Sequence, residues 1–559
     1  MAKIEHSASL PWCYYNKYSK RILIRITTSI DVNNVKIVYG DPFDYIKNKN
    51  GEHSWCSNET VLDKKYISDD SFLWQVELIP LKWRRMRYVF KIEIKEQNEM
   101  KLCYFSENGL VKFSENEIIE PYAHFFLPFI HEIDSPCVPE WAANTIWYQI
   151  FPERFMSGDN SISPHGCCNW ENGRPEFNNF FGGDLVGIRN KLDYLKDLGI
   201  TGIYLTPVFT SPSNHKYDTS DYMNVDPHFG GIEALKELVK EAHNRGIRIM
   251  LDAVFNHVSS KHPFWQDVLI NQENSQYRDY FHIHSFPVSE RYWDHKAINF
   301  DVFSFQERMP KWNTENTAVR DYLIGAACYW IKECDIDAWR LDVADEVTFN
   351  FWRAFSSAVR QAKDNFFILG EIWHDATPWI NANCFDSVMN YPLGFTIQDY
   401  FLKDKISIYE FNRRLFQIIS RYGKMHAEAA FNFLDSHDTT RILTTANGNR
   451  QTVRNALTML FLLPGSPCIY YGTEIGMEGG QDPDCRRPMI WKEEKQDKDL
   501  YKYIQYLIEF RKKNINFIHK CSIEFSTTEE TNGKWIFKYE DKFIILKYKN
   551  KIIEMETNL

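Results

Sequence analysis

The sequence predicts an α/β protein built around a (β/α)₈ barrel, with smaller β-rich regions before and after it. Three observations support this fold class. After about residue 145, short apolar strands alternate with amphipathic helices, which is the order of a parallel sheet. Eight such strands are present, the number that closes this barrel. The first 113 residues instead contain β-rich runs, and 559 residues are too many for one hydrophobic core.

The N-terminal region is predicted to be a β-sandwich over residues 1–135. Its strand candidates are RILIRIT, NVKIVYG, FLWQVELI, RYVFKIEIK and KLCYF, which polar or glycine-containing turns separate. A linker is expected around residues 131–145, because Pro136 and Pro139 interrupt regular structure there. The tail, residues 514–559, contains KWIFKYE and KFIILKYK and is predicted to be a small C-terminal β domain.

The barrel is predicted to span residues 136–513. Its eight strand candidates are TIWYQIFPERF, GIYLTPVF, IRIMLDAVF, DIDAWRLD, FFILGE, FDSVMNY, AAFNFLD and SPCIYYG. Asp184 is expected to cap the first helix, which ends at Gly199, and the second helix ends at Gly246. A long gap between His257 and a helix beginning near Thr317 predicts an inserted subdomain, about residues 258–316, after the third strand.

Composition narrows the classes of partner. The formal net charge of −10 argues against a nucleic-acid partner. The start, MAKIEHSASLPW, has no apolar run typical of a signal peptide, and no stretch is apolar enough for a membrane span. Twelve cysteines are too sparse for a disulfide scaffold, so free thiols in a reducing cytoplasm are expected. Aromatic residues make up 16% of the chain, which suits both core packing and stacking on sugar faces.

Polar residues stand at the C-terminal ends of several predicted strands, where barrel active sites form. They are Asp252, Asn256 and His257 after the third strand, Arg340 and Asp342 on the fourth, Glu371 and Trp373 on the fifth, and His437 and Asp438 on the seventh. Each acid alone is more simply explained as a helix cap or a surface ion pair. Acids from at least three strands at one barrel mouth favour an active site, because crowded carboxylates cost stability.

This set of acids suits glycoside hydrolysis. A retaining glycosidase needs two carboxylic groups about 5–5.5 Å apart, one as nucleophile and one as acid and then base. Neighbouring strands can hold Asp342 and Glu371 as that pair. Arg340 lies two residues before Asp342, so it points the same way along the strand and can keep the nucleophile ionised. A third acid, Asp438, would stabilise the positive charge that develops at the anomeric carbon.

Four segments, DAVFNH, DAWRLD, GEIW and SHD, resemble in order and spacing the main blocks of the α-amylase family of retaining glucosidases and transglucosidases, glycoside hydrolase family 13. The resemblance extends through NFFGGDLVGIRNKLDYLKDLGI, SNHKYDTSDY and GSPCIYYGTEIG and covers Trp147 to about Trp491. It implies that Asp342 is the nucleophile, Glu371 the proton donor and base, and Asp438 the transition-state stabiliser.

The same resemblance implies a set of sugar contacts. The residues concerned are His215, Tyr217, His257, Arg340, Trp373, His437, Asp482 and Arg486. Among them, Tyr217 would stack on the sugar at the cleavage point, and Asp482 and Arg486 would bind sugars further away. A single histidine, considered alone, would more often have a structural role. Asp482 and Arg486 could almost equally form a surface ion pair.

Other segments resemble one group within the family, the cyclomaltodextrinases, neopullulanases and maltogenic amylases. These segments are MPKW followed by Asn313, GEIWHDATPWI, FDSVMNYP and DPDCRRPM. The resemblance implies hydrolysis of mainly α-1,4 bonds in cyclodextrins, maltooligosaccharides and pullulan, with transfer to sugar acceptors, and it leaves α-1,6 bonds open. It also implies a homodimer formed through the N-terminal domain, which in this group is similar to a starch-binding module.

The sequence departs from the family at a calcium site. Related enzymes bind calcium through an Asn-Gly-Asp-x-x-Asn-Asp loop after the first strand, helped by the GGD segment. Here the loop, residues 157–163, reads SGDNSIS, so Asp159 and Asp184 remain as charged ligands and Ile162 replaces an oxygen donor. Because calcium needs six to eight oxygens, we expect this site to be weak or empty and no cofactor to be required. His282 and His284 have H-x-H spacing but no zinc-type partners, so they are predicted to be loop histidines.

Three alternatives remain open from the sequence. The first is an α-amylase or an oligo-1,6-glucosidase on the same barrel. The second is a non-catalytic, sugar-binding barrel subunit, which the intact acids Asp342, Glu371 and Asp438 argue against. The third is a metal-dependent barrel hydrolase, which is disfavoured because the first strand, WYQIFPERF, lacks a pair of metal ligands.

Overall fold

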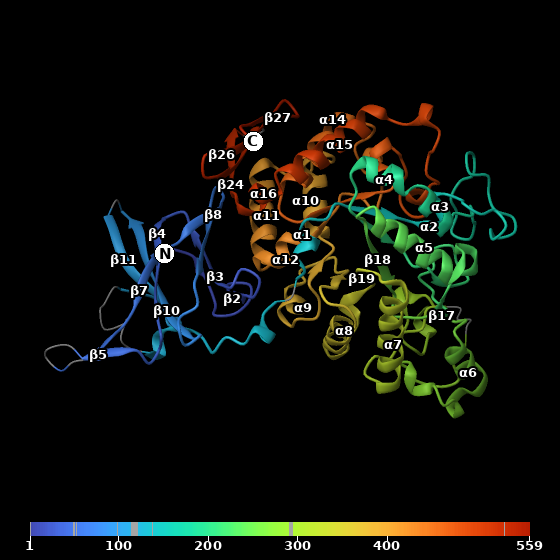
Figure 1. The fold of residues 1–559 in the computed structure, drawn as a ribbon, viewed down its shortest axis with the longest axis horizontal. Helices are drawn as coiled ribbons and strands as arrows, with labels where there is room; N and C mark the ends of the chain where they lie inside the picture. Colours follow the sequence, from blue (N-terminus) through green and yellow to red (C-terminus); the bar gives the residue numbers. More distant parts are fainter. Residues whose placement is uncertain are drawn as a thin grey trace. The chain divides into compact units, whose positions relative to one another are not determined.

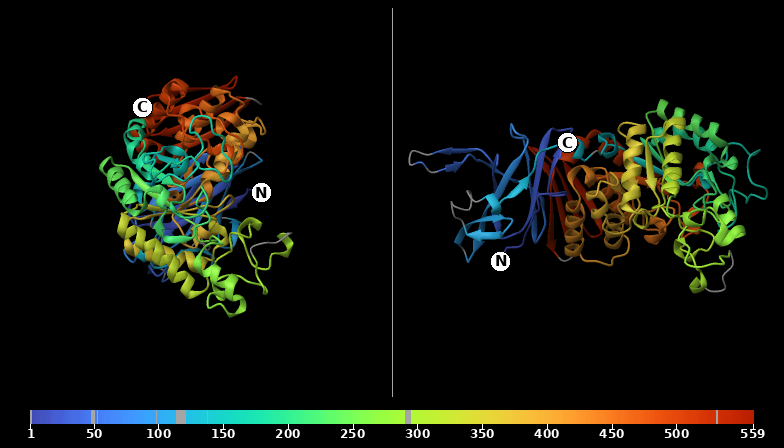
Figure 2. Two further views of the ribbon diagram at one scale, coloured as in Figure 1. Left: turned by 90° about the vertical axis from the view of Figure 1, so that its right-hand side faces the viewer. Right: turned by 90° about the horizontal axis from the view of Figure 1, so that it is seen from below.

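The computed structural model describes residues 2–47, 51, 53–97, 99–112, 121–136, 138–289, 295–529 and 532–559. The chain divides into two compact units. Unit 1 comprises Met1–Cys137, Lys405–Ala427 and Asn516–Leu559, and unit 2 comprises Val138–Asp404 and Glu428–Ile515. Figures 1 and 2 show the β-rich unit 1 in blue, with orange and red segments that include α11, and the barrel of unit 2 from cyan to orange-red.

Unit 1 contains two large β-sheets in its described part. The first has the order β1-β3-β9-β8-β24-β25-β26-β27, with β2 on β3; the second has the order β12-β11-β10-β4-β7, with β13 on β10. Their strands are β1 (Ile4–Glu5), β2 (Cys13–Asn16), β3 (Arg21–Ser29), β4 (Val32–Gly40), β7 (Asn58–Val61), β8 (Asp63–Ile67), β9 (Ser71–Leu78), β10 (Met86–Glu96), β11 (Glu99–Ser106), β12 (Gly109–Lys112), β13 (Phe125–Leu127), β24 (Ser522–Glu529), β25 (Asn532–Tyr539), β26 (Lys542–Lys549) and β27 (Ile552–Thr557). A separate hairpin joins β5 (Tyr45–Lys47) to β6 (His53–Trp55).

All five N-terminal strand candidates form strands, namely β3, β4, β9, β10 and β11. The two C-terminal candidates form β25 and β26. They belong to the same sheet as the N-terminal strands, because β24 pairs in parallel with β8, with Ile523 opposite Tyr66. The tail therefore completes an N-terminal sheet, where the sequence predicted a small domain of its own.

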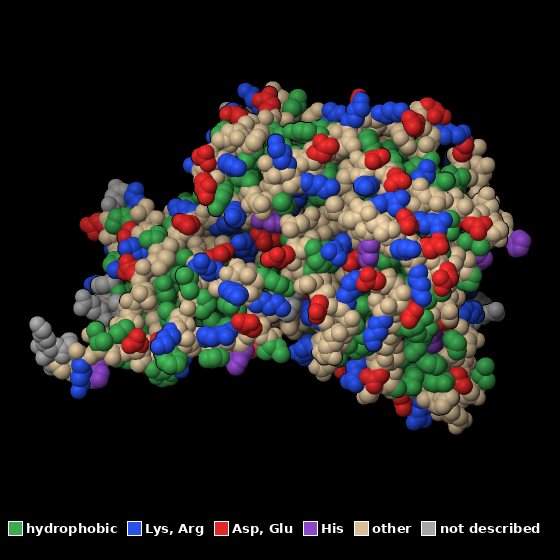
Figure 3. All heavy atoms as spheres, in the orientation of Figure 1, with side chains coloured by type: hydrophobic (Ala, Val, Ile, Leu, Met, Phe, Trp, Pro, Cys, Tyr) green, Lys and Arg blue, Asp and Glu red, His purple; other side chains and the backbone are tan. Residues whose placement is uncertain are grey.

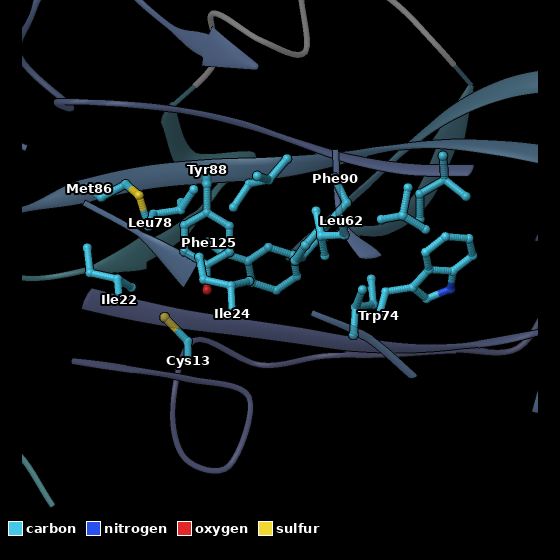
Figure 4. Packing of buried hydrophobic residues seen from close by; sticks show 14 of the residues in the cluster. Cys13, Ile22, Ile24, Leu62, Trp74, Leu78, Met86, Tyr88, Phe90 and Phe125 are labelled. Carbon is cyan, nitrogen blue, oxygen red and sulfur yellow. The ribbon is translucent and has the colours of Figure 1, made fainter. Parts of the chain in front are cut away.

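The core of unit 1 is lined by apolar side chains of strands such as β3 and β10. Ile22 and Ile24 on β3 and Tyr88 and Phe90 on β10 are almost fully buried. Phe125 packs against both aromatic rings. Figure 4 shows these side chains pointing into one apolar layer. The described α-helices of this unit are α11 (Ile408–Arg421), α12 (Lys424–Glu428) and α16 (Ile515–Lys520), and α11 contacts β24.

Unit 2 contains an eight-stranded parallel sheet with the order β21-β20-β19-β18-β15-β14-β23-β22 in the described residues. Its strands are β14 (Trp147–Ile150), β15 (Gly202–Leu205), β18 (Arg248–Ala253), β19 (Ala338–Leu341), β20 (Phe367–Gly370), β21 (Ser387–Val388), β22 (Phe431–Asn432) and β23 (Ser466–Tyr470). A parallel bridge between Met389 and Phe431 joins the two ends of this order, so the sheet closes into a barrel. The predicted fold class and all eight predicted barrel strands are confirmed.

Helices follow the strands and surround the barrel (Figures 1 and 2). They are α3 (Leu185–Asn190), α4 (Leu192–Leu198), α5 (Gly231–Asn244), α7 (Thr317–Cys334), α8 (Phe349–Ala362), α10 (Tyr391–Phe401), α14 (Arg450–Leu462) and α15 (Lys498–Lys513). Shorter elements are α1 (Glu140–Ala143), α2 (Pro152–Phe155), α9 (Thr377–Asn381), α13 (Ile442–Thr445), β16 (Phe209–Thr210) and β17 (Asp221–Val225). Asp184 caps α3 as predicted, because its side chain accepts from the Gly187 amide, and Gly199 ends α4 with φ of 101°.

The predicted insertion after the third strand is present. It holds α6 (Pro263–Asn271) and several short bridges, among them His257 with Lys311 and Ile283 with Phe300. The first of these bridges ties the far end of the insertion to the end of the third barrel strand.

The surface carries both signs of charge. On the face drawn in Figure 3, Lys and Arg side chains are interspersed with Asp and Glu, and neither sign forms a continuous patch. Among the described helices, none is both long enough and apolar enough to cross a membrane.

Candidate active site

A cavity of about 770 Å³ in unit 2 collects most of the residues predicted for the site. Its lining includes the three acids Asp342, Glu371 and Asp438, together with His215, Tyr217, His257, Trp373, Asp482 and Arg486. The two remaining predicted residues, Arg340 and His437, are almost completely buried and contact members of this lining. The structure therefore brings all eleven predicted catalytic and sugar-contacting residues together.

The Arg340 guanidinium holds three carboxylates. Its Nη1 lies 2.6 Å from Asp342 Oδ1 and 3.1 Å from Asp252 Oδ1, and its Nη2 lies 2.7 Å from Glu371 Oε2. All four side chains are at most 8% exposed. The planar fork of the guanidinium presents separate nitrogen atoms, so one buried cation contacts several carboxylates.

Asp342 has one oxygen engaged and one free. Arg340 binds Oδ1, whereas Oδ2 is buried and has no hydrogen-bond partner within the described residues. Burial raises the pKa of Asp342, Arg340 opposes this, and the negative charges of Glu371 and Asp252 add to the rise. Burial likewise raises the pKa of Asp252 to about 6 against the effect of Arg340. The raised pKa values of Asp342 and Asp252 therefore favour a proton shared between these two carboxyl groups.

Glu371 is fixed by donors on both oxygens. Trp373 Nε1 donates to Oε1 over 3.1 Å and the Tyr391 hydroxyl donates to it over 3.2 Å. The backbone N–H of Val343 donates to Oε2 over 3.0 Å. Val343 has φ of 46° and ψ of 48°, a left-handed conformation that is costly for a β-branched residue. This strained residue directly follows Asp342 and so links the two acids through the backbone.

The carboxylate of Asp438 lies between a histidine ring and an arginine guanidinium. His437 Nε2 is 3.3 Å from Oδ2, and Arg486 Nη2 is 3.4 Å from Oδ1. Arg486 also contacts Asp482 Oδ1 over 3.0 Å through Nη1 and donates from Nε to the His437 carbonyl over 2.9 Å. The pair Asp482–Arg486 is thus part of the cavity wall and is joined to Asp438.

Tyr217 and His437 form the floor beside Asp438. Their rings are parallel, 5.4 Å apart with 3° between the planes, and the Tyr217 hydroxyl is 2.6 Å from His437 Nε2. The Gln149 amide lies 2.7 Å from His437 Nδ1, and Tyr217 donates to Asp252 Oδ2 over 3.1 Å. With Gln149 donating to Nδ1, the ring proton is on Nε2. Burial lowers the pKa of His437 well below its ordinary value, so the ring is neutral.

The other two histidines are neutral for the same reason. Burial lowers the pKa of His257 to about 3 and that of His215 to about 4. His257 stacks on Phe303 with ring centroids 4.7 Å apart, and its Nε2 is buried with no partner in the part of the chain described. A buried nitrogen left without a partner is unusual, and a bound hydroxyl group would satisfy it.

Comparison with known proteins agrees with this geometry. Residues 149–520 match the family model for the α-amylase catalytic domain, and residues 1–131 match the model for the α-amylase N-terminal ig-like domain. The chain belongs to the α-amylase family of glycoside hydrolases. The resemblance inferred from the four sequence blocks is therefore confirmed.

Relatives in this family are similar to the protein along most of the chain. A cyclomaltodextrinase of Geobacillus thermopakistaniensis (strain MAS1) is 46% identical over 88% of this chain and 82% of its own. The intracellular maltogenic amylase of Bacillus subtilis (strain 168) is 43% identical over 93% of this chain and 85% of its own. A solved structure of a cyclomaltodextrinase superposes with a TM-score of 0.87 at 37% identity, covering 98% of this chain and 91% of that one.

At the position of the family's calcium loop, the remaining carboxylates bond to neighbouring protein groups. Asp184 Oδ2 accepts the amides of Gly158 and Asp159, each over 2.9 Å, and Oδ1 accepts that of Gly187 over 2.6 Å. Asp159 Oδ1 accepts both the amide and the hydroxyl of Ser161. Both oxygens of Asp184 and one oxygen of Asp159 are therefore engaged by protein donors, and the described residues contain no cluster of three or more His, Cys, Asp or Glu side chains arranged to hold a metal ion.

His282 and His284 lie in the insertion after the third strand, outside the catalytic cavity lining. The Nε2 atom of His284 is 2.8 Å from Asp301 Oδ1. Asp301 donates its amide to the carbonyl of His282, so the two histidines belong to the local turn structure.

Several residues of the site were not among the predicted contacts. Tyr204 donates to Asp252 over 2.6 Å, Gln149 contacts His437, and Tyr391 stacks under Trp373 at 4.1 Å. For Gln149 a signal exists, since it is a polar residue inside the fully buried strand WYQI. Tyr391 carries no comparable signal, because it begins α10 and approaches Glu371 only through the fold.

Proposed function

We propose that this enzyme hydrolyses α-1,4-glucosidic bonds of cyclodextrins and maltooligosaccharides with net retention of configuration. Asp342 Oδ2 forms a bond to the anomeric carbon while the bond to the leaving oxygen breaks, and Glu371 gives its proton to that oxygen. A water molecule then attacks the same carbon, Glu371 takes a proton from it, and the bond to Asp342 breaks. Asp438 stabilises the positive charge of both transition states.

The free oxygen of Asp342 carries this proposal. It is buried in the cavity lining without a partner, whereas the other oxygen is held by Arg340. A carboxylate held in this way is oriented for attack without a competing hydrogen bond. Glu371 contacts the same guanidinium, which supports the close spacing of the two acids that a retaining mechanism needs.

The choice of substrate rests on the similar proteins. Two of them are named as a cyclomaltodextrinase and a maltogenic amylase. The cavity has aromatic rings, carboxylates and neutral histidines in its lining, a mixture suited to rings that have apolar faces and hydroxyl edges. We extend the proposal to pullulan and to transfer onto sugar acceptors, and we infer that no calcium is required.

Replacing Glu371 by glutamine tests the mechanism. The amide keeps the shape of the side chain but has no proton to give, so kcat on β-cyclodextrin should fall about 10²- to 10⁴-fold. Glu346→Gln is the matched control, because Glu346 lines the same cavity yet pairs with Lys311, and it should change kcat by only a few fold. Activity of Glu371→Gln within a few fold of the parent, or a product released with the β configuration, would contradict the mechanism.

A substrate comparison separates the proposal from its neighbours within the family. The enzyme should turn over β-cyclodextrin faster than starch and faster than isomaltose. A wide preference for starch would identify an α-amylase, and a wide preference for isomaltose would identify an oligo-1,6-glucosidase.

We infer that unit 1 forms a homodimer interface. Phe43, Trp83 and Phe129 are 74%, 58% and 52% exposed, and the basic segment 82–85 contacts all three rings. Exposed apolar rings gathered on one surface are typical of association sites. Sedimentation should give a dimer for the parent and a monomer for Trp83→Ser with Phe129→Ser. A parent that sediments as a monomer at micromolar concentration would contradict this.

We also propose a cytoplasmic location. One similar protein is named an intracellular maltogenic amylase. The cysteines described in the structure are free, which suits a reducing compartment.

A further inference from the structure

A second cavity lies in unit 2, and we call it the outer cavity. It has a volume of about 920 Å³, and three segments form most of its lining, residues 170–175, 476–478 and 487–492. The described residues that line it are all different from those that line the catalytic cavity. Pockets that bind small molecules have volumes of about 300–1,000 Å³. The outer cavity is therefore large enough for a ligand, and the proposed mechanism makes no use of it.

A rigid turn carries one of the two tryptophans of the outer cavity. The side chain of Asn169 accepts the backbone amides of Glu171 over 2.9 Å and Asn172 over 3.1 Å, and its carbonyl oxygen accepts the amide of Gly173 over 2.8 Å. A Cβ on Gly173 would lie 2.6 Å from that carbonyl oxygen, so a larger residue would force the turn to shift. The turn therefore holds Trp170 in place through its own backbone.

The indoles of the outer cavity are fixed by their N–H groups. Trp170 Nε1 donates to the Met489 carbonyl over 3.0 Å, and Trp491 Nε1 donates to the Phe155 carbonyl over 2.7 Å. Both rings are half-buried, and the Lys191 ammonium lies 4.1 Å from the centroid of Trp491 and covers one of its faces. An indole whose N–H already has a partner offers a ligand its apolar ring surface, which suits the apolar face of a sugar. Trp170 is the better placed of the two for such stacking.

Most charged side chains of the outer cavity already have a partner. The pairs are Arg487 with Asp484, Lys492 with Glu171, and Arg450 with Asp497. The Arg487 guanidinium donates two hydrogen bonds to its carboxylate, over 2.8 and 2.7 Å. An anionic ligand would have to compete with these carboxylates for the cations, which disfavours phosphate and other anions as ligands.

Four polar side chains of the outer cavity are uncommitted. They belong to Asn172, Arg174, Glu478 and Lys495, which are exposed, and they form no hydrogen bond or ion pair within the described part of the chain. Two are cations, one is a carboxylate and one is an amide, so the set contains both donors and acceptors. A sugar hydroxyl both donates and accepts and needs no counter-charge. The outer cavity therefore suits a neutral ligand rich in hydroxyl groups.

We propose that the outer cavity is a second, non-catalytic binding site for linear α-glucans. Trp170 provides the stacking surface, and the four uncommitted side chains bind hydroxyl groups. The inference goes beyond the proposed function, which uses the catalytic cavity alone, and rests on that function only for the class of sugar. Of the carboxylates described in the outer lining, only Glu478 is unpaired, whereas glycoside hydrolysis needs two, so the site binds sugar without cleaving it.

Two segments of the chain contribute to both cavities. Residues 170–175 line the outer cavity, and Phe177, which is 63% exposed, lines the catalytic cavity. Asp482 and Arg486 line the catalytic cavity, and the next residue, Arg487, lines the outer cavity. The two cavities are therefore close to each other. A long glucan that is held at the outer cavity has a high effective concentration near the catalytic acids.

Sugar binding to the full-length Glu371→Gln variant tests the proposal without hydrolysis. Isothermal titration with maltotetraose should give two sugars bound per chain. Trp170→Ala in that background should weaken one of the two about tenfold, because a stacking contact is lost. Asn172→Ala with Glu478→Gln should have a similar effect, and these side chains have no bond in the described structure to lose. Glu176→Gln, which is exposed and outside both linings, should leave both sites unchanged.

Kinetics with an intact Glu371 provide a second readout. The ratio of kcat/KM for a long linear maltodextrin to kcat/KM for maltotriose should fall severalfold in Trp170→Ala, because maltotriose is too short to gain from a second point of attachment. The same ratio should keep its parent value in Glu176→Gln.

Three results would overturn the outer-cavity proposal. The first is fewer than two sugars per chain in Glu371→Gln, and the second is two sites that Trp170→Ala leaves unchanged. The third is displacement of the second sugar by inorganic phosphate, which would identify an anion site. Two sugars bound to Glu371→Gln, together with a parent that does not cleave maltotriose, would instead overturn the proposed function and leave the outer cavity as a sugar site.

Discussion

At the scale of single residues, the site depends on one buried cation. Arg340 contacts Asp342, Glu371 and Asp252, and the last of these also accepts hydrogen bonds from Tyr204 and Tyr217. Removing such a cation would leave buried carboxylates uncompensated, which is far more costly than losing a surface ion pair. The position of the nucleophile and the ionisation of the cluster are therefore set by the same side chain.

Tyr217 provides a prediction at this scale, because its hydroxyl and its ring have separable roles. Tyr217→Phe removes the contacts with His437 and Asp252 but keeps the ring, so kcat/KM on maltotriose should fall about tenfold, as expected for one or two lost hydrogen bonds. Tyr217→Ala also removes the stacking surface and should fall further. Steady-state kinetics with thermal unfolding as a folding control provide the measurement. Equal losses in the two variants would show that the ring contributes nothing to sugar binding.

The catalytic acids could be predicted from the sequence, whereas the residues that hold them in place through hydrogen bonds and ion pairs could not. Asp342 and Glu371 follow apolar runs directly, and the position after a strand places them at the barrel mouth whatever the details of packing. The contact between Arg340 and Glu371 depends on the direction of two side chains on neighbouring strands. The hydrogen bond from Tyr391 depends on how α10 is placed, which no local pattern in the sequence records.

At the scale of elements, the turn into α3 explains the GGD segment. Gly182 has φ of 81°, and a Cβ on Gly183 would lie 2.2 Å from the Pro152 carbonyl oxygen. Two glycines therefore allow the chain to reach Asp184, whose carboxylate caps α3 and holds the loop at residues 158–159. The segment therefore has a structural role in this chain, because it positions the residue that caps α3.

Substitution of Asp184 tests this reading. Asp184→Ala leaves three amides without their acceptor and should lower the stability of unit 2 by about 2 kcal/mol, with Asp184→Asn losing less. The midpoint of urea unfolding provides the measurement. Calcium at 1 mM should leave the parent midpoint unchanged, because an ion bound with a micromolar Kd would add about 4 kcal/mol. A clear rise with calcium would contradict the calcium-free interpretation.

Strand existence was predictable, whereas strand partners were not. The eight barrel strands stood out as apolar runs between amphipathic helices, and their number alone indicates a closed barrel. The parallel pairing of β8 with β24 joins Tyr66 to Ile523, and a contact between positions so far apart leaves no periodic trace in either segment. The separate C-terminal domain was therefore predicted from local sequence pattern alone. Only the folded structure shows that its strands belong to an N-terminal sheet.

At the scale of the whole molecule, buried neutral histidines should govern stability in acid. Burial lowers the pKa of His257 to about 3, and those of His215 and His262 to about 4, from an ordinary value of 6.5. Between pH 6.5 and those values the unfolded chain binds protons that the folded chain does not. Unfolding therefore becomes easier as pH falls through this range, and each histidine contributes a slope of up to about 1.4 kcal/mol per pH unit.

His262 allows this to be measured away from the cavity. It caps α6 through Nδ1 and lies 3.3 Å from the Tyr322 hydroxyl, and it is not part of the cavity lining. His262→Gln can accept the same amide but cannot titrate, so the fall in apparent Tm between pH 7 and pH 5 should be smaller than in the parent. His165→Gln, an exposed control, should follow the parent curve. If His262→Gln and the parent lose the same Tm between these pH values at one scan rate, protonation of the buried ring does not limit stability in acid.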